Sequence, residues 1–170
     1  MVLPILTYPD ARLGTVCAPA VLDDALRDLA AAMLETMYAA PGRGLAAPQV
    51  GAMLRLFVMD VTWKEGARAP VVMVNPEVLW RSDEQAEGPE GCLSIPGPTT
   101  MITRAQSVRM RWVDLDGAVQ EETLTGMAAI CAQHEYDHLD GVLTLDHLDE
   151  AARALALSEL ELPKNNVEIS

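Results

Sequence analysis

Basic residues, long apolar runs and cysteines are all scarce in this chain, and each scarcity argues against a class of function. Only 12 Lys and Arg oppose 25 Asp and Glu, a net charge of −13, which disfavours direct binding to nucleic acid or to an anionic membrane. No apolar stretch reaches the roughly 20 residues that a transmembrane helix needs. Residues 1–4 show no basic region followed by an apolar run, so no signal peptide is predicted. Three scattered cysteines are too few for a disulfide framework, and we expect a protein of the reducing cytoplasm.

The residues that are present include two histidines four positions apart, with a carboxylate beside the first. Four residues of an α-helix advance by about 400°, so His134 and His138 point the same way, one turn apart. Two imidazoles in this arrangement can bind one transition metal, and Glu135 can then act on a water beside it as the general base. The segment therefore predicts a metal-dependent hydrolase.

A catalytic site of this kind needs a third protein ligand and one open position for water. One group of metalloproteases takes this ligand from a His six residues after the second, but that position is Thr144 here, and His147 is out of frame. Cys92, in the segment Glu-Gly-Cys-Leu-Ser, is the better candidate because a thiolate binds zinc or ferrous iron strongly. We expect Cys92, His134 and His138 to hold one divalent ion, Fe(II) or Zn(II).

The 170 residues suit one domain, residues 1–170, with α+β architecture. Hydrophobic spacing predicts a helix from Asp23 or Asp24 to about Ala39, and a motif helix from Thr125 or Gly126 to about Leu139. The other predicted elements are buried strands at 54–61 and 71–74, a half-exposed strand at 108–112, a turn at 114–117, a return strand at 119–124, and a last helix after Asp149 that stops before Pro163. Short, largely antiparallel strands would pack around the central metal-binding helix.

A third motif lies upstream of the other two, in Gly42-Arg43-Gly44-Leu45-Ala46-Ala47-Pro48-Gln49. It lacks the Gly-Lys-Ser/Thr of a phosphate-binding loop. Together with the Cys92 segment and the His134–His138 helix, in this order, it resembles the motifs of the peptide deformylase family. The resemblance covers roughly residues 3–148. It implies an α+β fold and an enzyme of protein biosynthesis that removes the formyl group from N-formyl-methionyl peptides or nascent chains, releasing formate.

The resemblance also implies roles for single residues. The side-chain amide of Gln49 and the backbone N–H of Leu93 would donate to the oxyanion that forms on the attacked carbonyl. The methionine side chain would lie against Met127, Ile130 and Cys131 of the motif helix. The backbone of Gly44 could pair with the extended peptide by strand addition.

The chain departs from the family pattern at three positions. Arg43 stands between the two glycines, where an aliphatic residue is usual, and it would either favour peptides with acidic residues after the formyl-methionine or point to solvent without effect. Thr99 and Gly88 replace residues that help to hold the substrate in other members. Two alternatives are left open: a zinc endopeptidase, which the Cys92 motif and Thr144 argue against, and a deformylase-like protein that binds peptide or metal with altered substrate or little turnover, which Arg43 and Thr99 favour.

Three further groups receive plainer interpretations. Trp63 is interpreted as a packing residue, and the acidic cluster of Asp83, Glu84 and Glu87 as a solvated loop. The tail from residue 149 onward carries Arg153 and Lys164 as its only basic residues. Such a tail would be repelled by RNA phosphates, so we expect weak or no docking on the ribosome through it.

Overall fold

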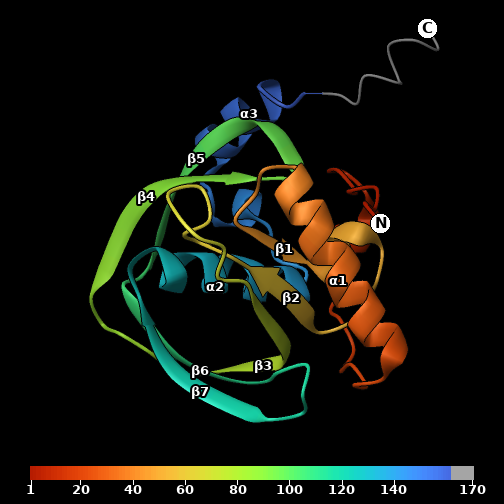
Figure 1. Ribbon diagram of the computed structural model, residues 1–170. Helices are drawn as coiled ribbons and strands as arrows, with labels where there is room; N and C mark the ends of the chain where they lie inside the picture. The colour runs from red at the N-terminus through yellow and green to blue at the C-terminus, as the bar shows by residue number, and fades with distance from the viewer. Residues whose placement is uncertain (162–170) are drawn as a thin grey trace, which may run out of the picture.

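The computed structural model describes residues 1–161, which form three α-helices, three 3-10 helices and seven strands (Figure 1). In chain order these elements are η1 Ala11–Gly14, α1 Asp24–Ala39, β1 Gly44–Ala46, η2 Ala47–Val50, β2 Leu56–Met59, β3 Val71–Arg81, β4 Gln85–Cys92, β5 Ile95–Ala105, β6 Ser107–Val113, β7 Val119–Thr125, α2 Gly126–Leu139, η3 Thr144–His147 and α3 Glu150–Ser158.

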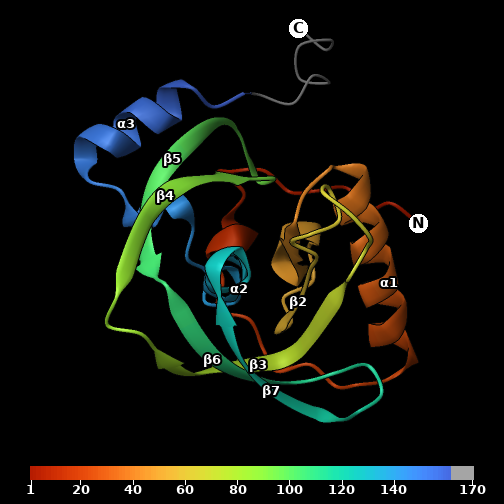
Figure 2. The ribbon, with the colours of Figure 1, turned by 60° about the vertical axis from the view of Figure 1, so that its left-hand side comes forward.

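Five strands form one antiparallel sheet in the order β1-β2-β3-β6-β7, and β4 pairs with β5 in a separate hairpin. Figure 2, which looks nearly along α2, shows this helix at the centre, with the hairpin on one side and the strands of the sheet around the others. The α+β class, with antiparallel strands around a central helix, is therefore confirmed. Helix α2 contacts β1, β2, β5, β6 and β7, so its side chains meet residues from distant parts of the chain.

Helix α1 begins as its sequence predicts. The Asp23 carboxylate caps it by accepting a hydrogen bond from the Leu26 backbone N–H at 2.8 Å. The apolar face of α1 packs against β1 and β2, with Met33 and Met37 fully enclosed and Leu29 and Leu34 partly buried. Burial of this stripe, more than intrinsic helix propensity, is what stabilises such a helix.

The strands of the main sheet agree with the prediction in place but not in length. Val108, Met110 and Trp112 of β6 are buried, as their alternation with arginines predicts. Strand β2 covers only Leu56–Met59, whereas β3 runs on to Arg81 instead of ending near residue 74. Pro76, just beyond the predicted end of this strand, has no N–H to donate to a ladder. The structure accommodates it where the register of β3 against β6 shifts, between Val74 and Glu77.

The β4–β5 hairpin was not predicted. Its two strands include Gly88, Pro89, Gly91, Pro96, Gly97 and Pro98, which are all poor strand formers. One consequence is a correction: Glu87 belongs to strand β4, and only Asp83 and Glu84 of the acidic cluster lie in the connecting loop.

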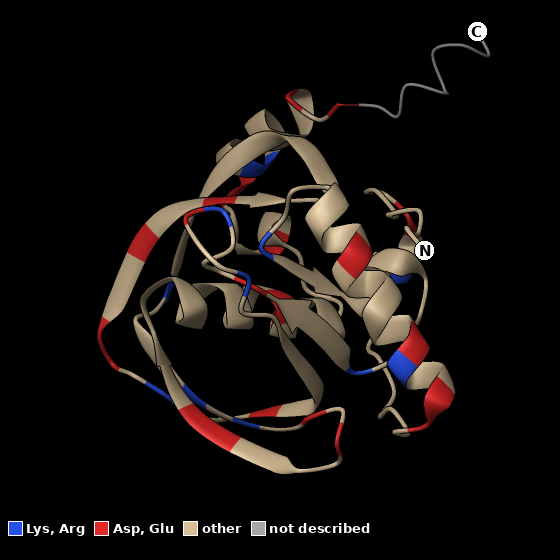
Figure 3. Ribbon diagram, in the orientation of Figure 1, with Lys and Arg blue, Asp and Glu red and all other residues tan. Residues whose placement is uncertain are grey.

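Helix α3 follows Asp149, whose side chain accepts from the Ala152 N–H at 2.8 Å, and ends at Ser158. Ala156 is buried and Leu160 packs against the same cluster, whereas Leu155 and Leu157 are exposed. The rest of the predicted tail, from Leu162 on, lies outside the described residues. Acidic segments are spread over most elements (Figure 3). Among the helices of residues 1–161, none combines the length and the apolarity required to cross a membrane.

Candidate active site

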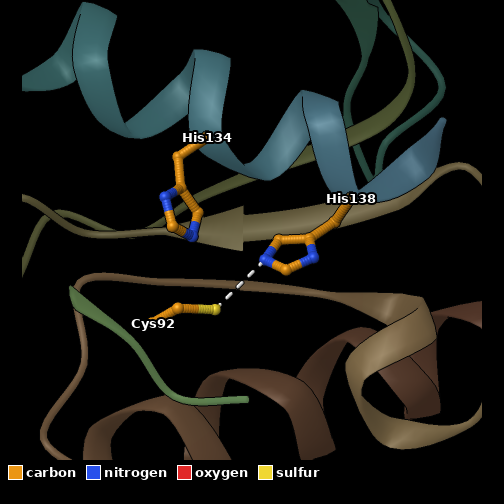
Figure 4. Close-up of side chains that lie close together, drawn as sticks. All are labelled: Cys92, His134 and His138. Carbon is orange, nitrogen blue, oxygen red and sulfur yellow. Dashed lines mark hydrogen bonds between the residues drawn. The ribbon is translucent and has the colours of Figure 1, made fainter. Parts of the chain in front are cut away.

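Two elements bring the three proposed metal ligands together (Figure 4). His134 and His138 project from one face of α2 with ring centroids 5.1 Å apart, and Cys92 lies at the end of β4. Their ligand atoms all lie within 4.8 Å of one another, the only such group of His, Cys, Asp or Glu within residues 1–161. The Cys92 Sγ is 3.5 Å from the His138 Nε2. One thiolate and two imidazoles so placed suit zinc or ferrous iron and leave a fourth position open.

A buried ion-pair network orients the first imidazole. Glu90 accepts from His134 Nδ1 at 2.9 Å, which turns the His134 Nε2 toward Cys92 and His138. Arg104 holds the same carboxylate through Nε at 2.7 Å and Nη2 at 3.0 Å, and its Nη1 donates to Asp137 at 2.9 Å. Burial by itself raises the pKa of Glu90, but the hydrogen bonds from His134 and Arg104 outweigh it and lower the pKa to about 2. An ionised carboxylate behind a ligating imidazole fixes its tautomer and orientation.

The Glu135 side chain is buried beside the two histidines, and its Oε1 has no hydrogen-bond partner among the described residues. Burial raises the pKa of Glu135 to about 7, against the opposing charges of His134 and Arg104. A carboxylate with one unsatisfied oxygen and a pKa near neutrality has the properties of a general base. Leaving this oxygen without a partner also costs free energy unless a water or a substrate group binds it. The environment of Glu135 is therefore compatible with a metal site that holds a reactive water.

Gln49 is held in one orientation. Its Oε1 accepts from the Ala46 backbone N–H at 2.9 Å, and its Nε2 donates to Ser94 Oγ at 3.0 Å and approaches Cys92 Sγ at 3.8 Å. The side-chain amide therefore presents its N–H groups on the Cys92 side. Leu93 follows Cys92 directly and lines the same cavity. The sequence assigned no role to Ser94, although it belongs to the Cys92 motif.

A cavity of about 340 Å³ opens in front of these groups. All five residues predicted to contact substrate line it: Arg43, Gly44, Met127, Ile130 and Cys131. Lys64, which received no role from the sequence, lines it as well. Thr99 instead borders a separate depression between β5 and α3, and a side chain at Gly88 would face open space.

Two glycines permit the close approach of the three motifs. A Cβ at Gly44 would lie 2.5 Å from Glu135 Oε2 and 2.9 Å from Cys131 Sγ. A Cβ at Gly42 would lie 2.8 Å from Leu93 Cδ1. These separations are shorter than real Cβ atoms show, so the glycines let α2 and the Cys92 segment pack directly against the backbone around β1.

Arg43 is not an isolated charge. Its Nη2 pairs with Glu65 Oε1 at 2.5 Å. His147 lies away from the proposed ligands, with its Nε2 2.8 Å from Asp137 Oδ2, which agrees with its exclusion as a ligand.

The sequence model of polypeptide deformylase matches residues 2–154 of this chain. The chain belongs to the polypeptide deformylase family. A peptide deformylase of Alkalilimnicola ehrlichii is 51% identical over 161 residues, which cover 94% of this chain and 89% of that protein. The crystal structure of a peptide deformylase from Legionella pneumophila superposes with a TM-score of 0.90 at 37% identity, over 99% of this chain and 97% of that one. The peptide deformylase of Ehrlichia chaffeensis gives 0.91 at 33% identity over the full length of both chains.

Deformylases are enzymes with a catalytic metal that act on formylated peptides, and membership in the family assigns this activity to the chain. The fold of the solved deformylases agrees with the α+β architecture described above. The two alternatives left open by the sequence, an endopeptidase and a binding protein without turnover, are therefore not favoured.

Proposed function

We propose that this enzyme hydrolyses the formyl amide of N-formyl-methionyl peptides and nascent chains at a metal ion held by Cys92, His134 and His138. The convergence of these three side chains carries the proposal. Two of them, Cys92 and His134, line the cavity together with Glu135 and Gln49. The donor set suits Fe(II) or Zn(II). We also propose that residues 1–170 act as one catalytic domain in the cytoplasm, where reducing conditions keep the Cys92 thiol available.

The chemistry that a divalent ion supplies at such a site is Lewis acidity, which lowers the pKa of a coordinated water from about 15.7 to near 7. Glu135 accepts a proton from the attacking water on its unpaired Oε1 and later delivers it to the leaving amine nitrogen. The water oxygen bonds to the formyl carbon, the carbon–nitrogen bond breaks, and formate and a free amino terminus result.

The other residues bind and orient the substrate. The Gln49 amide, fixed by Ala46 and Ser94, and the Leu93 backbone N–H donate to the oxyanion. Strand β1 is an edge of the five-stranded sheet, so an extended peptide can add to it at Gly44. The methionine side chain then occupies the cavity wall formed by Met127, Ile130 and Cys131.

A formate-release assay on formyl-Met-Ala-Ser, with metal analysis of the same anaerobic sample, tests this function. We expect formate in equal amount to the new free amine and about one metal ion per chain. Cleavage of an internal peptide bond, or no formate from metal-loaded protein, would contradict the proposal.

A further inference from the structure

The loop of residues 60–70, which joins β2 to β3, is held in a defined position beside the cavity. The buried Asp60 carboxylate accepts from Tyr38 Oη at 2.6 Å and from the Ala69 backbone N–H at 2.8 Å. These bonds tie both ends of the loop to helix α1. The Arg68 guanidinium lies 3.9 Å from the centre of the Tyr38 ring, and the Trp63 ring meets the same ring edge-on. Several independent contacts therefore order the loop.

The residues on either side of Lys64 bond the segment that leads into β1. Trp63 Nε1 donates to the Gly42 carbonyl at 2.9 Å, so Trp63 does more than pack. Glu65 pairs with Arg43. Lys64, between these two anchors, lies on the wall of the cavity. The backbone of Lys64 is thus positioned relative to Gly42 and Gly44 by the contacts of Trp63 and Glu65, and not by the flexible Lys64 side chain.

Lys64 also carries a charge that no carboxylate of residues 1–161 neutralises by an ion pair. It is exposed, with its Nζ 5.8 Å from the centre of the Trp63 ring. Arg43, the other cation at the cavity, is compensated by Glu65. Figure 3 shows basic segments in this loop, on a chain whose net charge is −13. Lys64 is therefore the cavity-lining Lys or Arg side chain without an ion-pair partner among residues 1–161, whereas Arg68 of the same loop stacks on Tyr38 and does not line the cavity.

We propose that Lys64 is a specificity-determining residue that favours formylated peptides carrying a carboxylate within the first residues after the formyl-methionine. The inference rests on the proposed function, because a peptide added to the edge of β1 continues past Gly44 and Gly42, where the loop is anchored. It reassigns to Lys64 the preference that the sequence suggested for Arg43.

The test uses two series of amidated peptides, formyl-Met-Xaa-Ala-Ser and formyl-Met-Ala-Xaa-Ser, with Asp, Asn or Lys as Xaa. Amidation removes the terminal carboxylate, which would otherwise supply a negative charge in every peptide. The measured quantity is the ratio of kcat/KM for formate release between the Asp and Lys peptides. For one exposed ion pair we expect a ratio of about two to five at an ionic strength of about 0.01 M, and near one at about 1 M.

Single substitutions test which residue causes the preference for Asp peptides. Lys64→Met should abolish the preference and Lys64→Glu should reverse it. Arg81→Met is the matched control, because Arg81 is an exposed cation of β3 that does not line the cavity, so the net charge changes equally and the ratio should stay as in the wild type.

The outcomes separate this inference from the proposed function. Formate release from every peptide without an Asp preference in either series would overturn the role of Lys64 alone. The role of Lys64 would also be overturned by an Asp preference that persists in Lys64→Met or that falls by the same factor in Arg81→Met. An Asp preference that disappears only in Arg43→Met would overturn it as well. No formate from any peptide would contradict the proposed function, and the inference with it.

Discussion

Replacing Gly44 by Ala tests the packing of the general base against strand β1. The added methyl would lie 2.5 Å from Glu135 Oε2, whereas ordinary van der Waals contact of a Cβ begins at 3.4 Å, so about 0.9 Å of movement is required. Strand β1 cannot easily move away, because Gly44 pairs with Met59 and the Asp60 N–H donates to the Arg43 carbonyl at 2.8 Å. The Glu135 carboxylate is therefore the group that must shift.

A shift of this size should act mainly on turnover. A misplacement of about 1 Å in an active site can lower the rate by about 10²-fold, and we expect kcat for formate release to fall by about that factor. Overpacking of a close contact costs roughly 1–3 kcal/mol of stability. Reduced freedom of the unfolded chain offsets about 0.4–1 kcal/mol of it, because the Gly44 backbone does not have a positive φ. Urea unfolding should therefore show a net loss of about 0–2.6 kcal/mol, with the metal content unchanged.

Gly14→Ala is the control, because its Cβ would meet no atom within 4 Å. This variant should keep wild-type turnover. A folded, metal-loaded Gly44→Ala enzyme with kcat within about twofold of wild type would refute the argument that Glu135 requires its observed position.

Four further perturbations probe the metal site, the proton transfer, the oxyanion donor and the tail. Cys92→Ser should sharply weaken metal binding in equilibrium dialysis, and full occupancy would show that Cys92 is not a ligand. Glu135→Gln should lower turnover by about 10²-fold or more with near-normal metal content, and Gln49→Leu by a roughly comparable factor through the lost oxyanion donor; wild-type turnover in either variant would remove that residue from the mechanism. The enzyme should show weak or no co-sedimentation with ribosomes at physiological salt, and binding that disappears on deletion of residues 149–170 would contradict the prediction from the acidic tail.

Elements fixed by short-range interactions were predictable from the sequence, whereas those fixed by long-range pairing were not. Helix α1 and the position of α2 were predictable because capping by Asp23 and the spacing of apolar residues act within a few residues. The β4–β5 hairpin was missed because its glycines and prolines hide the alternation that a strand normally shows. Its position is decided by pairing between strands, which residue types alone do not specify.

The ion-pair network behind His134 was also not predictable from local sequence patterns. Glu90 and Arg104 belong to segments that resembled the family, but no spacing rule connects them. They meet because β4 and β5 pair, and Asp137 joins them from α2. The orientation of the imidazole depends on this meeting of two strands and a helix.

The sequence by itself determined that His134 and His138 share a helix face with Glu135 beside them, because 3.6 residues per turn is a property of the backbone. Motif order, through the resemblance, also suggested Cys92 and Gln49 as their partners. Only the tertiary structure decided how these groups meet: the missing side chain of Gly44 admits Glu135, and Arg104 neutralises Glu90 behind the ligand. It also decided that Glu65 compensates Arg43 while Lys64 remains at the cavity wall. These features depend on distances between segments far apart in the chain, and local sequence patterns carry no information about such distances.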